Sequence, residues 1–186
     1  MRSIVVLATL ALLLAACEPD YITADRLEPF EAAQIITEAK DEILTAPLAH
    51  DSHMADLHAR LSSSEEKISF DLTRAKRQLV GNTHHQRHDI NVLIDSHAHT
   101  ALSEVARART RIDRFDAEAR AAYLEEVRRL ENLDAPTREQ TETIIQAARD
   151  AFANDELDEW VNNAESSSIR AAESIQNELN RIRTSP

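Results

Sequence analysis

The eight histidines are the side chains whose type and spacing most suggest chemistry, because all of them lie between positions 50 and 99. Imidazole and carboxylate groups are the usual protein ligands of zinc and copper. Side chains three or four residues apart lie on one face of a helix. The candidate metal ligands fall into a stripe and a smaller half-site, with His84, His88, Asp95 and His99 in the stripe and His50 and His53 in the half-site.

The two groups predict one divalent-metal site, for Zn or Cu, if the chain brings them together. A turn at Gly81-Asn82 predicts that the helix carrying His50 folds back near His84 and His88. Three alternatives stay open. The histidines could form an inert exposed face, His97 could be a hydrogen-bonded core residue on the apolar seam, or the imidazoles could sense pH, since they titrate near neutrality.

The only cysteine, Cys17, closes an N-terminal segment with the features of a signal peptide. The basic start Met1-Arg2-Ser3 precedes an apolar run over residues 4–14, which is too short to cross a bilayer because a crossing needs about 20 residues. The ending Leu14-Ala15-Ala16-Cys17 resembles the lipobox of bacterial lipoproteins. The resemblance covers only this segment. It implies diacylglycerol on the Cys17 thiol, cleavage just before Cys17, and usually fatty acylation, such as palmitate, of the new amine.

Two alternatives to lipidation are ordinary signal cleavage that leaves a cysteine, and an uncleaved anchor. Leu14 fits ordinary cleavage poorly, because that cut prefers a small residue three positions before it. The predicted organisation is therefore a signal peptide over 1–16, a lipidated tether over 17–25 and a single α-helical domain over 26–186.

The charge of the chain bears on its partners. The formal charge is −12, and removal of the signal with its one cation, Arg2, makes it −13 (−12 − 1). Nucleic-acid-binding proteins concentrate cations, so we expect no nucleic-acid partner. Anionic lipid headgroups would repel such a chain, so the lipid rather than electrostatics would hold it at a membrane.

The composition predicts an all-α protein. The chain has one glycine and few aromatic residues, and its apolar residues recur at three- and four-residue steps. We expect an elongated bundle of four to five helices with a long antiparallel coiled-coil-like pair. Pro47, Gly81 and Pro136 mark breaks, and Ser63 and Thr137 begin capping-box patterns. The expected helices are 25–46, 48–61, 137–152, 157–182 and a long helix that carries the histidine stripe, with its apolar seam over 90–130 and no break at 113–116. From about 63 to the turn at 81, either a new helix begins or the helix over 48–61 bends and continues.

Known catalytic patterns are missing from the sequence. It contains no nucleophile elbow, glycine-rich phosphate loop, His-Glu-x-x-His motif or pair of Glu-x-x-His motifs. A run of arginines precedes a run of acids in the predicted long helix. One interpretation is an ion-paired solvent face. The other is a docking strip, either for an acidic partner or for a second copy of the chain. The cations of this run are Arg107, Arg109, Arg111 and Arg114.

These observations predict a membrane-anchored periplasmic lipoprotein that is not an enzyme and acts as an envelope scaffold, adaptor or accessory subunit. We expect a protein partner in the envelope, and self-association through the long helix is a second option. Glu18, rather than the Asp that retains many enterobacterial lipoproteins at the inner membrane, favours the outer membrane. The alternative function is divalent-metal binding or sensing by the clustered histidines.

Overall fold

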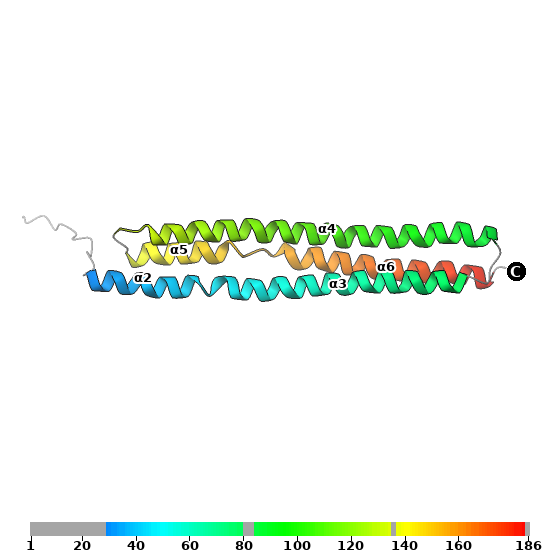
Figure 1. Cartoon of the computed structure of the whole chain (residues 1–186), viewed down its shortest axis with the longest axis horizontal. Coiled ribbons are helices and arrows are strands. Elements are labelled where there is room, and N and C mark those ends of the chain that lie inside the picture. Colours follow the sequence, from blue (N-terminus) through cyan, green and yellow to red (C-terminus); the bar gives the residue numbers. More distant parts are fainter. Residues whose placement is uncertain (1–28, 80–83, 135–136, 185–186) are drawn as a thin grey trace, which may run out of the picture.

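The computed structural model describes residues 29–79, 84–134 and 137–184, which form five helices and no strand. The helices are α2 (Pro29–Ile43), α3 (Ala46–Gln78), α4 (His84–Glu131), α5 (Arg138–Asp150) and α6 (Glu156–Thr184). They lie side by side in one elongated body (Figure 1). The predicted all-α elongated bundle with a long antiparallel pair is confirmed, with α3 and α4 as that pair.

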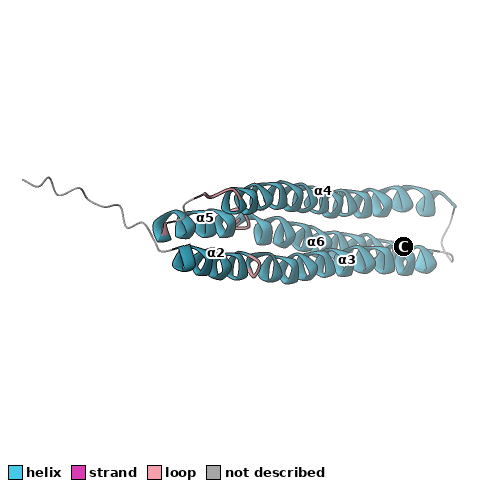
Figure 2. Ribbon diagram, turned by 60° about the vertical axis from the view of Figure 1, so that its left-hand side comes forward, coloured by secondary structure: helices cyan, strands magenta, loops and turns pink. Residues whose placement is uncertain are grey.

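The helices form three rods that run the length of the molecule (Figure 2). The first rod is α2 followed by α3, the second is α4 alone, and the third is α5 followed by α6. The first and third rods run in the same direction, and α4 runs against both. At 48 residues, α4 is about 70 Å long, so the body is several times longer than it is wide.

The break in the first rod follows from Pro47. Proline lacks a backbone N–H, and its ring clashes with the carbonyl four residues earlier, which is that of Ile43. α2 ends at Ile43 and α3 begins at Ala46, with Pro47 in its first turn. The Thr45 hydroxyl donates to the Glu42 carbonyl at 2.7 Å, which satisfies one of the carbonyls at the end of α2. The predicted break at Pro47 is confirmed.

The predicted capping box at Thr137 is confirmed, and a second side chain caps α6. The Thr137 hydroxyl accepts from the Gln140 amide at 3.2 Å, and the Gln140 side chain accepts from the Thr137 amide at 3.2 Å, which completes the capping box. After α5 ends, the Asn154 side chain accepts from the Glu156 amide at 2.8 Å and caps α6.

Of the two alternatives for residues 62–66, the start of a new helix is wrong, because α3 is continuous from Ala46 to Gln78. Its buried residues keep the three- and four-residue spacing straight through the serines, from Leu61 to Ser64 to Ile68. The packing of this continuous stripe against the other rods outweighs the local capping signal of Ser63. α4 likewise runs through residues 113–116 without a break, as predicted, and it begins at His84 and so carries the histidine stripe.

Two apolar clusters make up the core. The larger one joins α3, α4 and α6 and includes the fully buried Leu57, Leu61 and Ile112. Alanines on both sides, such as Ala101 on α4 and Ala164 on α6, have no long side chain to hold the two rods apart. The smaller cluster joins α2, α4 and α5 at the N-terminal end of the first rod.

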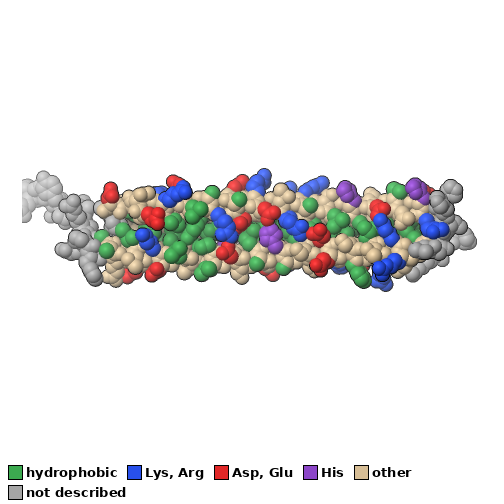
Figure 3. Space-filling model, in the orientation of Figure 1, with side chains coloured by type: hydrophobic (Ala, Val, Ile, Leu, Met, Phe, Trp, Pro, Cys, Tyr) green, Lys and Arg blue, Asp and Glu red, His purple; other side chains and the backbone are tan. Residues whose placement is uncertain are grey.

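The surface of the bundle is polar and mixed in charge. Acidic and basic side chains alternate along the face drawn in Figure 3. None of the helices in the described ranges combines the length and the apolar character that a membrane crossing needs.

Two leucines of α3 give a matched test of the core. Leu61 has no exposed surface, whereas Leu48 is 67% exposed. Leu61→Ala should lower the free energy of unfolding by about 2 to 5 kcal/mol, because it removes buried methyl groups and leaves a cavity. Leu48→Ala should change it by less than about 0.5 kcal/mol. Urea unfolding followed by circular dichroism measures both, and equal losses would contradict the assignment of the buried face.

Candidate functional site

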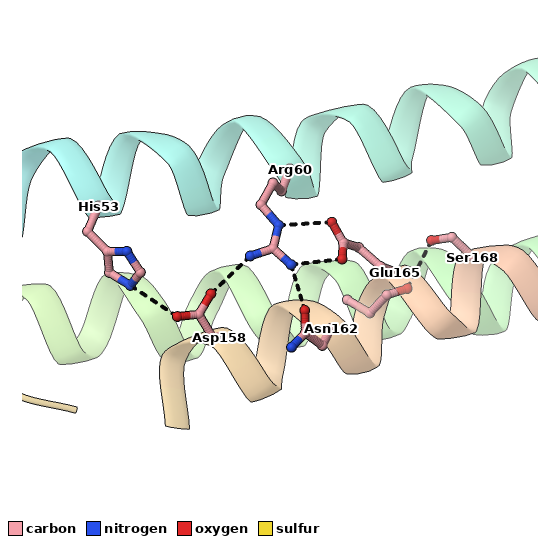
Figure 4. A network of polar contacts seen from close by, with 7 residues as sticks. His53, Arg60, Asp158, Asn162, Glu165 and Ser168 are labelled. Atoms are coloured by element: carbon pink, nitrogen blue, oxygen red, sulfur yellow. Dashed lines mark hydrogen bonds and ion pairs between the residues drawn. The ribbon is translucent and has the colours of Figure 1, made fainter. Parts of the chain in front are cut away.

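The most extensive polar cluster joins the first and third rods around Arg60 of α3 (Figure 4). Its guanidinium donates from Nε to Glu165 Oε1 at 3.0 Å and from Nη2 to Glu165 Oε2 at 2.8 Å, a bidentate pair. It also donates to Asp158 at 3.0 Å and to Asn162 at 2.6 Å. These three partners lie three or four residues apart on α6, so one arginine holds almost two turns of the opposite helix.

The pKa of Arg60 is raised above its ordinary value, chiefly by the hydrogen bond to Glu165, and despite the opposing effect of partial burial. The guanidinium is therefore charged at neutral pH. His53, almost two turns before Arg60 on α3, extends the cluster through an Nε2–Oδ2 distance of 3.6 Å to Asp158. All of these groups are engaged with one another, so the cluster works as a clamp between two rods.

A second polar cluster joins α3 and α4 around His50, which is only 5% exposed. Its Nε2 lies 2.8 Å from Asp116 Oδ1, and its ring stacks on Phe152 with the centroids 4.5 Å apart. Arg120 donates from Nε to Asp116 at 3.0 Å and from Nη2 to Asp51 of α3. Partial burial tends to raise the pKa of Asp116, but the hydrogen bonds from Arg120 and His50 outweigh it, so this pKa lies below its ordinary value of 3.8.

This second cluster lies where both outer rods are interrupted. Phe152 belongs to the turn between α5 and α6, and its ring also lies 5.3 Å from that of Tyr123. Burial raises the pKa of the Tyr123 hydroxyl. The smaller apolar cluster contains Tyr123 and Phe152, and the larger one contains Phe115, whose ring lies 6.0 Å from His50. His50 is therefore the polar link between the two parts of the core.

The predicted meeting of the two histidine groups does not occur. His50 lies beside Asp116, and the 28 residues of α4 between Asp116 and His88 span about 42 Å. The expectation was wrong because α3 continues to Gln78 before the chain turns, which carries the turn far from His50 and His53. Each of these two histidines instead contacts one carboxylate of another helix.

The stripe on α4 is also separated into individual side chains. Asp95 pairs with Lys76 of α3 at 2.6 Å, while His88 and His99 are exposed. The histidines on the face drawn in Figure 3 lie apart from one another. Within the described ranges, no three or more His, Cys, Asp or Glu side chains come close enough to hold a metal ion. The side chain of His84, the turn at residues 81–82, Cys17 and the signal segment lie outside the described residues.

A groove of about 480 Å³ follows the seam between α4 and α6 on the outside of the bundle. Trp160 and Arg111 lie at one end of it, and His97 and Ser174 lie at the other. The Arg111 guanidinium carbon is 5.7 Å from the centre of the Trp160 ring, a cation–π contact. His97, expected in the core, is half-buried and lines this groove instead.

The arginine run of α4 is largely ion-paired, as expected for a solvent face. Arg107 pairs with Glu104 at 2.6 Å, Arg109 with Glu65 at 3.0 Å, and Arg114 lies 3.9 Å from Glu118. Arg111 has no carboxylate partner within the described ranges. Three members thus belong to an ion-paired solvent face, while Arg111, which lines the groove together with Arg107, does not.

Sequence reasoning missed three residues that organise these features: Arg60, Asp116 and Arg170. Asp158, Asn162 and Glu165 lie three and four residues apart, which marks one polar face of α6, but nothing local identifies Arg60 as their partner 98 to 105 residues away. Arg170, which lines the groove, looks like any other exposed helical arginine in the sequence.

No protein-family model, curated protein or solved structure matches this chain.

Asp116→Asn tests the cluster around His50. The folded-state pKa of Asp116 lies below 3.8, so the carboxylate stabilises the fold above that pH and loses its contribution as the pH falls through the folded-state pKa. The variant should lower the free energy of unfolding by about 1 to 3 kcal/mol at pH 7, because it weakens charged hydrogen bonds. The loss should be smaller at pH 3 than at pH 5, as measured by urea unfolding.

The control is Asp89→Asn, at an exposed position of the same helix with no ion pair within the described ranges. It should leave the stability nearly unchanged at every pH. A loss for Asp116→Asn that stays constant from pH 7 to pH 3 would contradict the proposed role of its charge.

Proposed function

We propose that this protein is a lipid-anchored scaffold of the bacterial cell envelope that acts by contact rather than by catalysis. The observation that carries the proposal is a long bundle with clearly separated ends. α2 begins at one end of it, and the end of α3, the start of α4 and the end of α6 lie at the other (Figure 1). An anchor at Cys17, 12 residues before Pro29, would attach the bundle to a membrane by its α2 end.

Such an anchor would hold the far end away from the membrane surface. α4 alone measures about 70 Å, and the bundle is at least that long. Formal charge supports an upright position, since a net charge of −12 opposes contact with anionic headgroups. The clamps around Arg60 and His50 support stiffness, because they connect α3 to α6 and to α4 at defined positions.

The outer membrane is the proposed location, because Glu18 follows the anchor cysteine. The proposed partner is another envelope protein, met along the length or at the far end of the bundle. Self-association of two copies of the chain through α4 is the second option.

Cys17→Ser tests the anchor. The full chain, expressed in an enterobacterial host fed radiolabelled palmitate, should become labelled and fractionate with membranes. Cys17→Ser should lose the label, because the acyl group is attached through the cysteine. Label that persists in Cys17→Ser would overturn the proposal.

Glu18 offers a matched test of sorting in the same host. Glu18→Gln should leave the labelled protein in the outer-membrane fraction, whereas Glu18→Asp should move it to the inner-membrane fraction. Density-gradient separation of the two membranes measures this. Inner-membrane location of the unchanged chain would contradict the proposed position.

Neutron reflectometry tests the upright position. Lipidated protein on a supported bilayer with anionic lipid should form a layer at least about 70 Å thick. A bundle lying flat would give a layer of only about 20 Å, since packed helices are separated by about 10 Å. The thinner layer would rule out a spacer role.

A further inference from the structure

We propose that the groove between α4 and α6 binds an extended acidic segment of a partner protein. The inference rests on the proposed scaffold function and names the chemistry of its partner. The first observation in its support is the charge of the side chains that line the groove. The whole chain is strongly acidic, yet this groove is lined by Arg107, Arg111 and Arg170 and by only one carboxylate, Glu104.

The pairing of these charges leaves two cations available. Glu104 is taken by Arg107 at 2.6 Å. Neither Arg111 nor Arg170 contacts a carboxylate within residues 29–79, 84–134 and 137–184. Arg111 belongs to α4 and Arg170 to α6, so the groove has a positive charge on each of its two sides.

The shape of the groove fits a linear ligand. From Arg111 to His97 it follows 14 residues of α4, which corresponds to about 20 Å. An extended peptide of about six residues has the same length, because a strand rises about 3.3 Å per residue. Four other polar side chains line the groove and can form hydrogen bonds with peptide groups: Thr100, Asn163, Ser167 and Ser174. The Thr100 hydroxyl donates to the Ser96 carbonyl at 2.9 Å, so it is available as an acceptor.

The aromatic residue at the end of the groove favours a peptide over an acidic sugar chain. A sugar ring would need an open aromatic face to stack on. Trp160 is half-buried against the larger apolar cluster, and the Arg111 guanidinium lies over its ring at 5.7 Å. A ligand carboxylate can approach the outer side of that guanidinium without displacing it.

Trp160 also provides the measurement, because it is the only tryptophan of the chain. The full chain in detergent is titrated with N-acetylated hexaglutamate amide, which charge repulsion keeps extended. We expect a saturable change in tryptophan fluorescence that weakens as salt is added, since the ion pairs formed are exposed. Parallel titrations use a galacturonate hexasaccharide and inorganic phosphate.

Arg170→Ala should weaken hexaglutamate binding at least tenfold. Arg138→Ala is its matched control, because it also removes one positive charge from an exposed position. Arg138 lies outside the groove. It should bind like the unchanged chain. Circular dichroism melts of both variants verify that each is folded.

Three results would overturn the inference: no saturable signal with hexaglutamate, equal weakening by the two variants, or tighter binding of the galacturonate than of the peptide. Phosphate binding as tight as hexaglutamate binding would also overturn it, because it would show a single-anion site. Palmitate labelling is independent of all four results, so loss of the groove ligand and loss of the anchor can be told apart.

Discussion

The bundle depends on the contact between His50, Asp116 and Phe152, because it occurs at the level where both outer rods lose their helical hydrogen bonds. At that level only α4 is continuous. The imidazole, 2.8 Å from Asp116, connects α3 to α4, and its stacking on Phe152 connects α3 to the α5–α6 turn. A buried polar group favours the one axial alignment in which its partner is met. One side chain thus contacts all three rods and, together with the Arg60 clamp, favours a single axial alignment.

Local signals in the sequence predicted most of the fold. Pro47, the capping box at Thr137 and Asn154 each act within a few residues, so their effects can be read directly from the chain. The serines near residue 63 misled because packing of the α3 stripe against two other rods decides that region. The contacts within the two polar clusters were harder to predict from the sequence. His50 and Asp116 are 66 residues apart, and only the lengths of α3 and α4 bring them together.

The histidine pattern shows why spacing on one helix is a weak sign of a metal site. Spacing places side chains on a common face, but a metal shell needs ligands that converge on one point. Here the long, nearly parallel rods give each α3 histidine a different neighbour: Asp116 for His50, Asp158 for His53 and Asp113 for His58. The same carboxylates that could have completed a shell are distributed along the seams of the bundle.

The odd number of rods has a mechanical consequence. A chain that crosses the body three times starts at one end and finishes at the other, so Pro29 and Thr184 lie far apart (Figure 1). Were the protein held by its N-terminal end and pulled through its C-terminal end, the load would run along the rods. The seams would then be loaded in shear, and the Arg60 clamp and the packed alanines would share the force at once. An even number of rods would bring the ends together and let the contacts open one after another.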